Sequence, residues 1–450
     1  MLYTVWVLCI ALVLYPLTNF LYTDRHSVHT LQYLHSPFSK CSNLDGPCFD
    51  WNSPCQHSTA IYIYPPDEGS WFERSYFKSM VAKTTELQKF QRRIEFALRT
   101  DPSLTVVDDP NQACLFIPHI SCLSVNSCAL PRIFAKARLT RLPSWNNGRN
   151  HIVLDHGDDP FAYVASGDGA EIRMRSASST QFHRKGFDIG LSLRPKVSTY
   201  GDVVKGGAAF AASQRPILVG FLGAPTTTAT TTTSTSTSTS TSSPPLDLRR
   251  SLMTLHDVQR NIHIIVRPPT CAVPCPQHQP EYYTEYKSML FQSQFQLVPR
   301  GQGLHSHRLL ESIASGSVPI VLADHIVLPF ADIIPWEKAI LVVKEQDWSS
   351  VPTIARTHLK HVQEMQCAGL AIYRHFFLRP HGTINIGMRL LQQRVRRHPN
   401  FRGNATRGTP ELLPSWPHDR IPKVPSFCRS SVRAQEIERI VDEMNRESRL

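Results

Sequence analysis

The chain has 450 residues and a formal net charge of +12, although only 19% of its side chains are charged. This length leaves room for two domains of ordinary size, each with its own core. The excess of cations favours an anionic partner, such as a nucleotide donor, an acidic polysaccharide or a membrane surface, and nucleic acid is disfavoured because no basic run is interleaved with aromatic residues.

Residues 1–23 contain no charged side chain and consist mostly of aliphatic and aromatic residues. Their length matches the hydrocarbon core of a bilayer, so we expect an uncleaved, membrane-spanning signal anchor. A cleavable signal peptide is the alternative, but no charged segment precedes the apolar run and no small-residue cleavage site follows it. The polar, histidine-rich residues 24–47 are expected to form a stem between the membrane and the folded body.

Cysteine usage points to an oxidising compartment. One of the eleven cysteines, Cys9, falls in the expected anchor, and the even number that remains favours disulfide bonds. A zinc site is the alternative, but the chain contains no CxxC motif. Asn404 begins a glycosylation sequon, Asn-Ala-Thr, which supports the secretory pathway. The cysteines that cluster or pair along the sequence are Cys41, Cys48, Cys55, Cys122, Cys128, Cys271 and Cys275.

Short apolar strands alternate with helical segments through residues 48–215. This alternation predicts an α/β domain with a mostly parallel sheet. Helices are expected within residues 75–99 and 133–142, where apolar residues recur at helical spacing. The expected strands are Ile61–Tyr64, Leu104–Val107, Cys114–Ile117 and His151–Leu154.

Acidic and histidine residues follow the last of these strands, where open α/β sheets place their sites. Asp155, His156 and Asp158 are therefore candidates for a general base, and Asp188 is a further candidate. The alternative for each is a solvated turn with carboxylates that cap a helix. The residues alone do not choose among them.

Residues 225–245 are almost entirely threonine and serine between prolines, and such a composition cannot form a packed core. We expect a disordered insert within a second domain, residues 216–398. Strands are expected in this domain at residues 216–223 and 262–266, and helices at 248–255 and 282–290. Residues 399–450 would form a proline-rich tail with a polar helix at Ser431–Glu447.

The stretch from Phe295 to Trp336 carries the sharpest local signal. A short apolar run, a glycine-bearing loop, a helical segment and a second β-branched run predict a βαβ unit whose loop suits a phosphate. Arg308 and Glu311, three residues apart, share one face of the helix. There a cation could meet a diphosphate and a carboxylate could hold sugar hydroxyls, whereas the alternative is an exposed surface ion pair.

This stretch resembles the exostosin family of glycosyltransferases, glycosyltransferase family 47. Segments of the first half, such as Trp145 to His151 and Gly186-Phe187-Asp188, resemble the first catalytic domain of animal heparan sulfate exostosins. The resemblance covers residues 48–395, apart from the threonine and serine insert. The matching positions in the second half are Leu297 to Gly301, Arg308, Glu311, Gly316, Val318, Pro319, Val321 to Asp324, Leu328 to Phe330, Asp332 and Trp336.

The family implies a GT-B fold, in which two Rossmann-like domains face a cleft, and a type II membrane protein of the Golgi or endoplasmic reticulum. Residues 48–215 would be the acceptor side and residues 216–398 the donor domain. No cofactor is implied, and the absence of an Asp-x-Asp motif does not support a metal, so arginines and backbone amides would stabilise the leaving UDP. The implied donor-binding residues are Arg249, Arg300, Gly301, Ser306, Arg308 and Glu311.

The resemblance therefore implies an inverting glycosyltransferase that moves a sugar, glucuronic acid as the first choice, from UDP to a glycan acceptor, for which an anionic glycan is one option. A base among Asp155, His156 and Asp188 would take the acceptor proton. The alternatives are a non-catalytic exostosin-like subunit that binds glycan or supports a partner exostosin, and a lumenal lectin. The chain departs from its relatives at His305, where they usually have glycine, and this side chain is expected to crowd the donor loop.

Overall fold

The structure of the protein is a computed structural model that describes residues 41–52, 54–65, 92–118, 139–155, 170–197, 199–224, 248–267, 280–301, 303–379, 382–403 and 424–447. The expected anchor, most of the stem, the threonine and serine insert and the sequon at Asn404 lie outside these residues. Within the described parts of the chain, no helix combines the length and the apolar character needed to cross a membrane. The anchor therefore stays a prediction.

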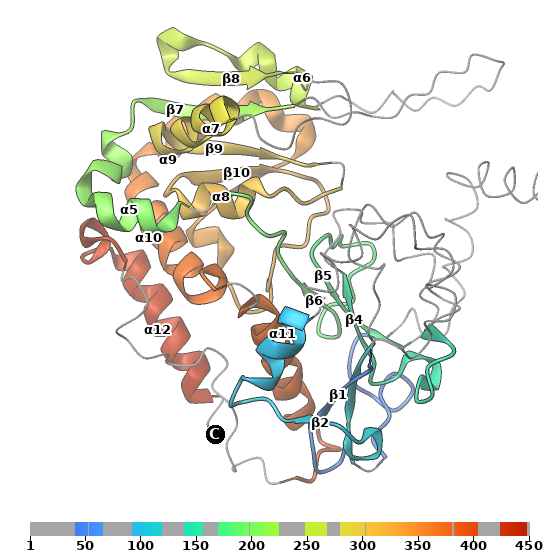
Figure 1. The fold of residues 1–450 in the computed structure, drawn as a ribbon. Helices are drawn as coiled ribbons and strands as arrows, with labels where there is room; N and C mark the ends of the chain where they lie inside the picture. The colour runs from blue at the N-terminus through green and yellow to red at the C-terminus, as the bar shows by residue number, and fades with distance from the viewer. Residues whose placement is uncertain are drawn as a thin grey trace, which may run out of the picture.

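Five parallel strands form the sheet of the C-terminal half, in the order β11-β10-β9-β7-β8 (Figure 1). Side chains alternate between its faces, because Phe295 and Leu297 pack into one apolar cluster and Val298 packs into another. A parallel sheet covered on both faces needs apolar residues at nearly every position, and all of β7 is buried. The strands are β7 (Ile217–Gly223), β8 (Ile262–Val266), β9 (Ser293–Pro299), β10 (Val318–Leu322) and β11 (Leu341–Val343).

Helices cover both faces of this sheet, which gives a three-layer α/β/α half. Leu248 of α6 and Val351 of α9 pack on one face, and Tyr286 of α7 and Leu310 of α8 pack on the other. The strands and helices predicted at residues 216–298, and the βαβ unit after them, are confirmed. The helices are α6 (Leu248–Leu252), α7 (Pro280–Gln292), α8 (Arg308–Ala314), α9 (Val351–His358) and α10 (Val362–Ile372), which continues as a π-helix over Tyr373–Phe377.

Two three-stranded parallel sheets, β2-β1-β3 and β4-β5-β6, lie in the N-terminal half. A parallel bridge between Phe116 and His151 joins them edge to edge. The four predicted strands are confirmed, three with shorter bounds and the fourth shifted by one residue, and two further strands are present. They are β1 (Ile61–Ile63), β2 (Val106–Val107), β3 (Leu115–Ile117), β4 (Ile152–Asp155), β5 (Ile172–Arg175) and β6 (Ile189–Gly190). Every strand pair in the described chain is parallel, so the α/β class with parallel sheets is confirmed.

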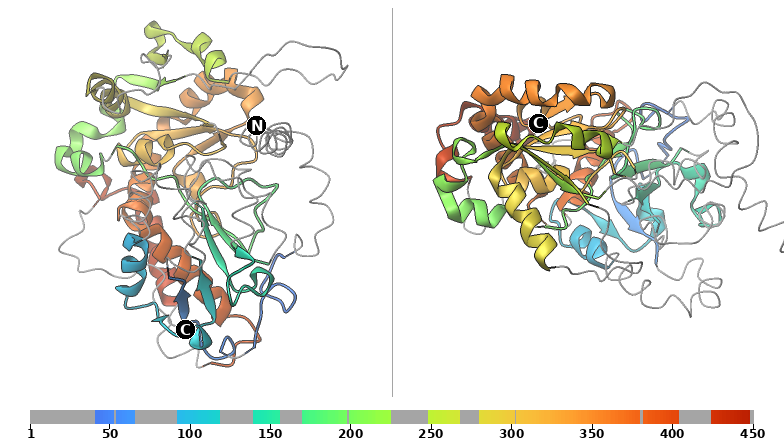
Figure 2. Two further views of the ribbon diagram at one scale, coloured as in Figure 1. Left: turned by 45° about the vertical axis from the view of Figure 1, so that its right-hand side comes forward. Right: turned by 90° about the horizontal axis from the view of Figure 1, so that it is seen from above.

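Two described segments pass between the halves. Residues 191–197 lead from β6 towards α5 (Tyr200–Gly206), where the Tyr200 ring stacks on Tyr373 at 5.4 Å (Figure 1). After α10 the chain returns as α11 (Gly382–Arg396), which runs along the N-terminal half in both views of Figure 2. There Arg389 forms a buried ion pair with Asp101. The C-terminal segment of the described chain thus helps to hold the N-terminal sheets.

Backbone hydrogen bonds also join the two halves where the loop after β5 meets the loop after β10. Ser179 and Ile326 form an antiparallel bridge, and the Val327 N–H donates to the Ser178 carbonyl at 3.0 Å. We call these paired segments, residues 178–180 and 325–327, the junction. Because the backbones themselves are paired, the junction fixes the two loops against each other more firmly than side-chain contacts alone would.

Three disulfides confirm the prediction of bonded cysteines: Cys41–Cys48, Cys55–Cys114 and Cys367–Cys428. The third ties α10 to the segment before α12 (Val432–Glu447), the predicted polar helix of the tail. On this helix Glu438 pairs with Arg374 at 3.0 Å, so the tail helix packs on the body. Cys122, Cys128, Cys271 and Cys275 lie outside the described residues.

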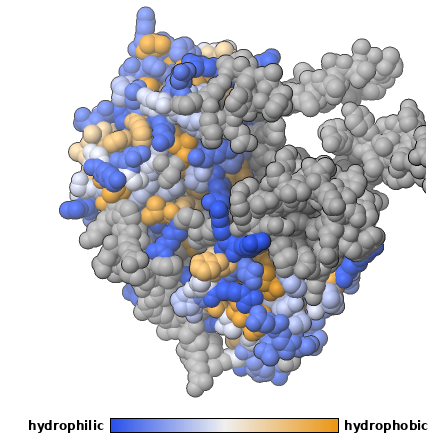
Figure 3. All heavy atoms as spheres, viewed as in Figure 1, coloured by the Kyte–Doolittle hydropathy of each residue, from blue (hydrophilic) through white to orange (hydrophobic). Residues whose placement is uncertain are grey.

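The surface shown in Figure 3 is mixed in character. Hydrophilic and apolar residues alternate across the described part of this face, without one continuous apolar area. The large apolar side chains that are most exposed in the described chain belong to separate elements, for example Phe96, Val342 and Val432. Scattered exposure of this kind is ordinary for a folded protein surface.

Candidate functional site

The carboxyl ends of β7 and β9 form the natural site of the C-terminal half. From β7 the chain goes to β8 on one side and then to β9 on the other, so the strand order reverses between β7 and β9. In open parallel sheets the loops diverge at such a point and leave a crevice for a ligand. The loop after β9 leads directly into α8, and this places the predicted donor loop at that crevice.

Arg308, the first residue of α8, reaches over the end of β7. One of its Nη atoms donates to the Leu222 carbonyl at 2.5 Å. Its guanidinium also lies 4.8 Å from the centre of the Phe221 ring and 5.1 Å from that of Tyr286. Two aromatic rings so close to a cation stabilise it and fix its orientation. Arg308 Nε is buried and has no hydrogen-bond partner within the described chain.

Arg249 and Arg300 line the same end of the sheet. Arg249 donates to the carbonyls of Ala224 and Arg300, both at 2.9 Å, and so connects the segment after β7 with the segment after β9. The Arg300 guanidinium pairs with Glu345 at 3.1 Å. The structure therefore brings Arg249, Arg300 and Arg308 together at one edge, as the sequence predicted, although two of them hold neighbouring loops.

The loop between β9 and α8 folds back on itself. A Cβ atom added to Gly301 would lie 2.9 Å from the His305 carbonyl, so this close approach requires glycine. The Ser306 hydroxyl accepts a hydrogen bond from the Arg308 N–H at 3.3 Å. Gly301 and Ser306 thus shape the turn that presents Arg308.

The His305 ring contacts the junction, through the backbone of Ser178 and Val327. Its side chain is only 3% exposed. Burial lowers the pKa of His305 to about 4, although hydrogen bonds to the backbone of Ser178 and Val327 act in the opposite direction. The ring, expected to crowd the donor loop, is accommodated among these junction residues and stays neutral at physiological pH.

Glu311 is engaged on both of its oxygens. Oε1 accepts the backbone N–H groups of Lys196 at 2.8 Å and Val197 at 3.3 Å, and Oε2 accepts the Tyr286 hydroxyl at 2.5 Å. The residue is 3% exposed. The pair of Arg308 and Glu311 is therefore no exposed surface ion pair, which was the alternative drawn from the sequence.

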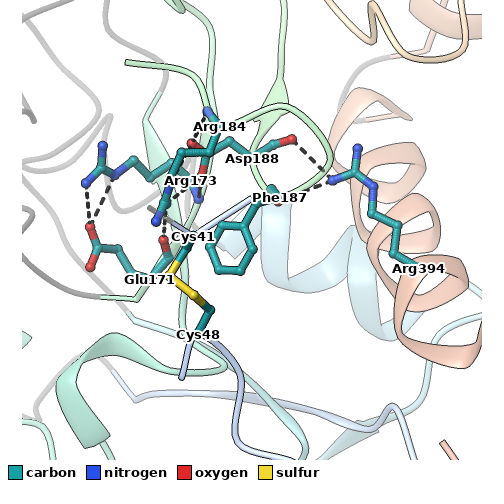
Figure 4. Close-up of polar contacts among 8 residues, drawn as sticks. All are labelled: Cys41, Cys48, Glu171, Arg173, Arg184, Phe187, Asp188 and Arg394. Carbon is teal, nitrogen blue, oxygen red and sulfur yellow. Dashed lines mark hydrogen bonds and ion pairs between the residues drawn. A yellow bond between two sulfur atoms is a disulfide. The ribbon is translucent and has the colours of Figure 1, made fainter. Parts of the chain in front are cut away.

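Asp188 directly precedes β6 and is level with Arg173 of β5 in the strand register, whereas Asp155 ends β4 opposite Arg175. Its carboxylate accepts the Arg173 N–H at 3.0 Å and, from Arg184, the backbone N–H at 2.9 Å, Nε at 3.0 Å and Nη2 at 2.7 Å (Figure 4). Arg394 donates to the Asp188 carbonyl from α11 at 3.2 Å.

The surroundings of Asp188 keep it ionised. Burial alone would raise the pKa of this carboxyl group, but the charge and hydrogen bonds of Arg184, with Arg173 beside it, hold the pKa below its ordinary value. A carboxylate saturated in this way is a poor proton acceptor. The geometry favours a positioning role for Asp188 in the turn before β6, and its assignment as the general base stays a prediction.

Asp155 is the last residue of β4, at the crevice end of its sheet, and His156 and Asp158 lie outside the described residues. Arg175 was not among the predicted site residues, and it stands opposite Asp155 in the register of β4 and β5. Arg175 is buried, and its charge contributes to the low pKa of His305. An arginine that ends a buried strand was the signal that could have indicated it.

Comparisons with known proteins agree with this architecture. The model of the exostosin GT47 domain matches residues 55–358. Exostosin-1 of Drosophila melanogaster is 28% identical over 375 residues, which are 75% of this chain and 44% of the relative. Exostosin-1a of Danio rerio is 24% identical over 409 residues, 85% and 51% of the two chains, and Exostosin-1 of Bos taurus is 23% identical over 374 residues, 78% and 45%.

The chain spans about half the length of these relatives. The domain match covers all three described sheets, from Cys55 before β1 to the end of α9 at His358. It includes the crevice with Arg249, Arg300 and Arg308 and the turn that carries Asp188. Because this match extends over more than half of the sequence, the chain belongs to the exostosin GT47 family, a family of glycosyltransferase domains.

Proposed function

We propose that the protein is a glycosyltransferase that binds a UDP-sugar, with glucuronic acid the first choice, at the carboxyl ends of β7 and β9. The observation that carries this proposal is the position of Arg308, held between two aromatic rings at the point where the strand order reverses. A guanidinium with donors directed to such a crevice suits a diphosphate. In this proposal the two halves are the domains of a GT-B fold, residues 48–215 and 216–398.

The transfer would proceed by inversion. The acceptor hydroxyl forms a bond to the anomeric carbon while the bond from that carbon to the UDP oxygen breaks, and the acceptor proton passes to a base of the N-terminal half. Asp155 is the candidate base that lies at the crevice end of its strand. The leaving UDP gains negative charge, which Arg308 and Arg249 would stabilise without a metal ion.

The acceptor would be a glycan, as in the synthesis of heparan sulfate or another polysaccharide. An anionic acceptor agrees with the net charge of +12. The three disulfides support a lumenal body in the Golgi or endoplasmic reticulum, because such bonds persist in oxidising compartments. In the same proposal residues 1–23 anchor a type II membrane protein, and a partner exostosin supplies a second activity.

The test is incubation of the purified full-length chain with a panel of UDP-sugars and a glycan acceptor, with UDP release as the measurement. We expect release with one sugar, and loss of release in Arg308→Ala. Arg260→Ala is the matched control, because Arg260 is an exposed arginine of the same half that precedes β8. UDP binding without turnover would indicate a non-catalytic subunit, and glycan binding without any affinity for UDP would indicate a lectin.

A further inference from the structure

The first chain segment that crosses between the halves lies directly against α8. This crossing segment, residues 194–197, follows β6 and leads to α5 (Figure 1). The carbonyl of Arg194 is 2.6 Å from Nδ1 of His307, the residue before α8. Val197 is buried in the apolar cluster of α7, with Tyr286 and Met289. The crossing segment is therefore held to the donor half at both of its ends.

Glu311 makes the central contact of this arrangement. It belongs to α8, yet its Oε1 accepts from two consecutive backbone amides more than a hundred positions earlier, Lys196 and Val197. Two adjacent N–H groups that converge on one carboxylate oxygen form a charge-assisted pair, which is stronger than a neutral hydrogen bond. Buried N–H groups need such a partner, because an unsatisfied one costs roughly 1–3 kcal/mol.

The second oxygen of Glu311 links the crossing segment to Arg308. It accepts the Tyr286 hydroxyl at 2.5 Å, and the Tyr286 ring lies 5.1 Å from the Arg308 guanidinium. Burial raises the pKa of Tyr286 well above its ordinary value, so the hydroxyl remains a donor at physiological pH. Protein donors therefore occupy three of the roughly four acceptor sites of this carboxylate, and the residue is buried, so little capacity remains for a sugar hydroxyl.

We infer that Glu311 is a positioning residue: its carboxylate ties the crossing segment to α8 and, through Tyr286, sets the orientation of Arg308. The consequence for donor affinity rests on the proposed function, whereas the tie itself is a property of the free protein. A glutamine side chain can make the same contacts, since its carbonyl can accept both amides and its NH₂ group can donate to the tyrosine oxygen. A direct ligand of ribose or sugar hydroxyls would instead lose its charge-assisted hydrogen bond in the glutamine variant, because such a bond is roughly twice as strong as a neutral one.

The experiment compares Glu311→Gln and Glu311→Ala in the full-length chain. Hydrogen exchange of the Lys196 and Val197 amides is measured without ligand, and UDP affinity is measured by titration. Glu364→Ala is the matched control, because Glu364 also accepts one hydroxyl, from Ser431 at 2.8 Å, and one backbone amide, from Arg433 at 3.0 Å, but near the tail helix. We expect exchange at the two amides to rise about tenfold or more in Glu311→Ala and to stay near wild type in the other two variants.

The affinity for UDP should weaken about tenfold in Glu311→Ala and remain within about threefold of wild type in Glu311→Gln. Equal weakening in both variants, with unchanged exchange, would overturn the inference and make Glu311 a direct ligand. Unchanged exchange in Glu311→Ala would overturn it as well. If wild type binds no UDP, the proposed function fails, and the exchange measurement alone decides whether Glu311 ties the crossing segment.

Discussion

Replacement of Asp188 by asparagine distinguishes a structural role of this carboxylate from a role as the catalytic base. Each carboxylate oxygen accepts two hydrogen bonds from Arg173 and Arg184. In the variant an NH₂ group faces two of these donors, so two charge-assisted bonds of roughly 1.5–3 kcal/mol each are lost. Arg184, whose side chain is 9% exposed, also loses its counter-charge. We expect the free energy of unfolding to fall by about 3–5 kcal/mol, the usual cost of breaking a buried ion pair.

The assay is chemical denaturation of the wild-type and Asp188→Asn chains under oxidising conditions, with UDP release measured in parallel. Asp332→Asn is the control, because that carboxylate is 29% exposed and pairs with Arg394. A partly exposed pair contributes less than about 1 kcal/mol, so this control should unfold close to wild type. If Asp188→Asn unfolds at the wild-type denaturant concentration but releases no UDP, the positioning role is refuted and Asp188 takes part in the chemistry.

Three further predictions concern stability. Arg215 is buried and donates to carbonyls of Phe210, Leu290, Ser293 and Ser315 without a described carboxylate partner, so Arg215→Met should lower the free energy of unfolding by about 3–5 kcal/mol in denaturant titrations. Burial holds the pKa values of His151 and His305 at about 4, so the unfolded chain binds protons first as the pH falls below about 6.5, and stability should drop between pH 6.5 and 4 by roughly 3 kcal/mol per histidine. Loss of the Cys367–Cys428 bond, which closes a separation of 61 residues, should cost about 4 kcal/mol in the Cys367→Ser and Cys428→Ser double variant.

For each of these three predictions, a specific result would contradict it. Arg260→Met, at an exposed ion pair, should leave stability unchanged, and an equal loss at Arg215 and Arg260 would refute the argument from burial. A His151→Gln, His305→Gln double variant should lose most of the acid sensitivity, and an unchanged pH profile would show that other groups cause it. A serine double variant as stable as the wild type would show that packing alone holds the tail helix.

Local signals in the sequence were sufficient to predict the βαβ unit of the C-terminal half. The βαβ unit of β9, α8 and β10 follows from a β-branched run, a glycine-bearing loop and helical spacing at Leu310 and Ile313, and the structure has these elements where they were expected. The position of Arg308 follows in turn, because the first residue of such a helix lies at the carboxyl end of the sheet. Patterns of this kind are complete within about thirty residues, so one segment carries all the information.

Local sequence patterns did not indicate the contacts between segments that are far apart in the chain. The partners of Glu311 lie 115 and 25 positions away, at Lys196 and Tyr286, and nothing in its own helix indicates them. Asp188 was a further candidate without an assigned strand, because it precedes β6, a strand of two residues that is too short to show periodicity. The docking of α11 on the N-terminal half likewise depends on Arg389 meeting Asp101, a pairing that only the tertiary fold creates.

The central claim is that a nucleoside diphosphate binds where β7 and β9 end. Calorimetric titration of UDP into the purified full-length chain tests it most directly, with Arg308→Ala and Arg260→Ala measured beside the wild type. We predict saturable binding to wild type and to Arg260→Ala, and a loss of roughly tenfold to a hundredfold in affinity for Arg308→Ala at unchanged unfolding. A folded wild-type chain that binds no UDP, or an Arg308→Ala chain that binds it as tightly, would contradict the account.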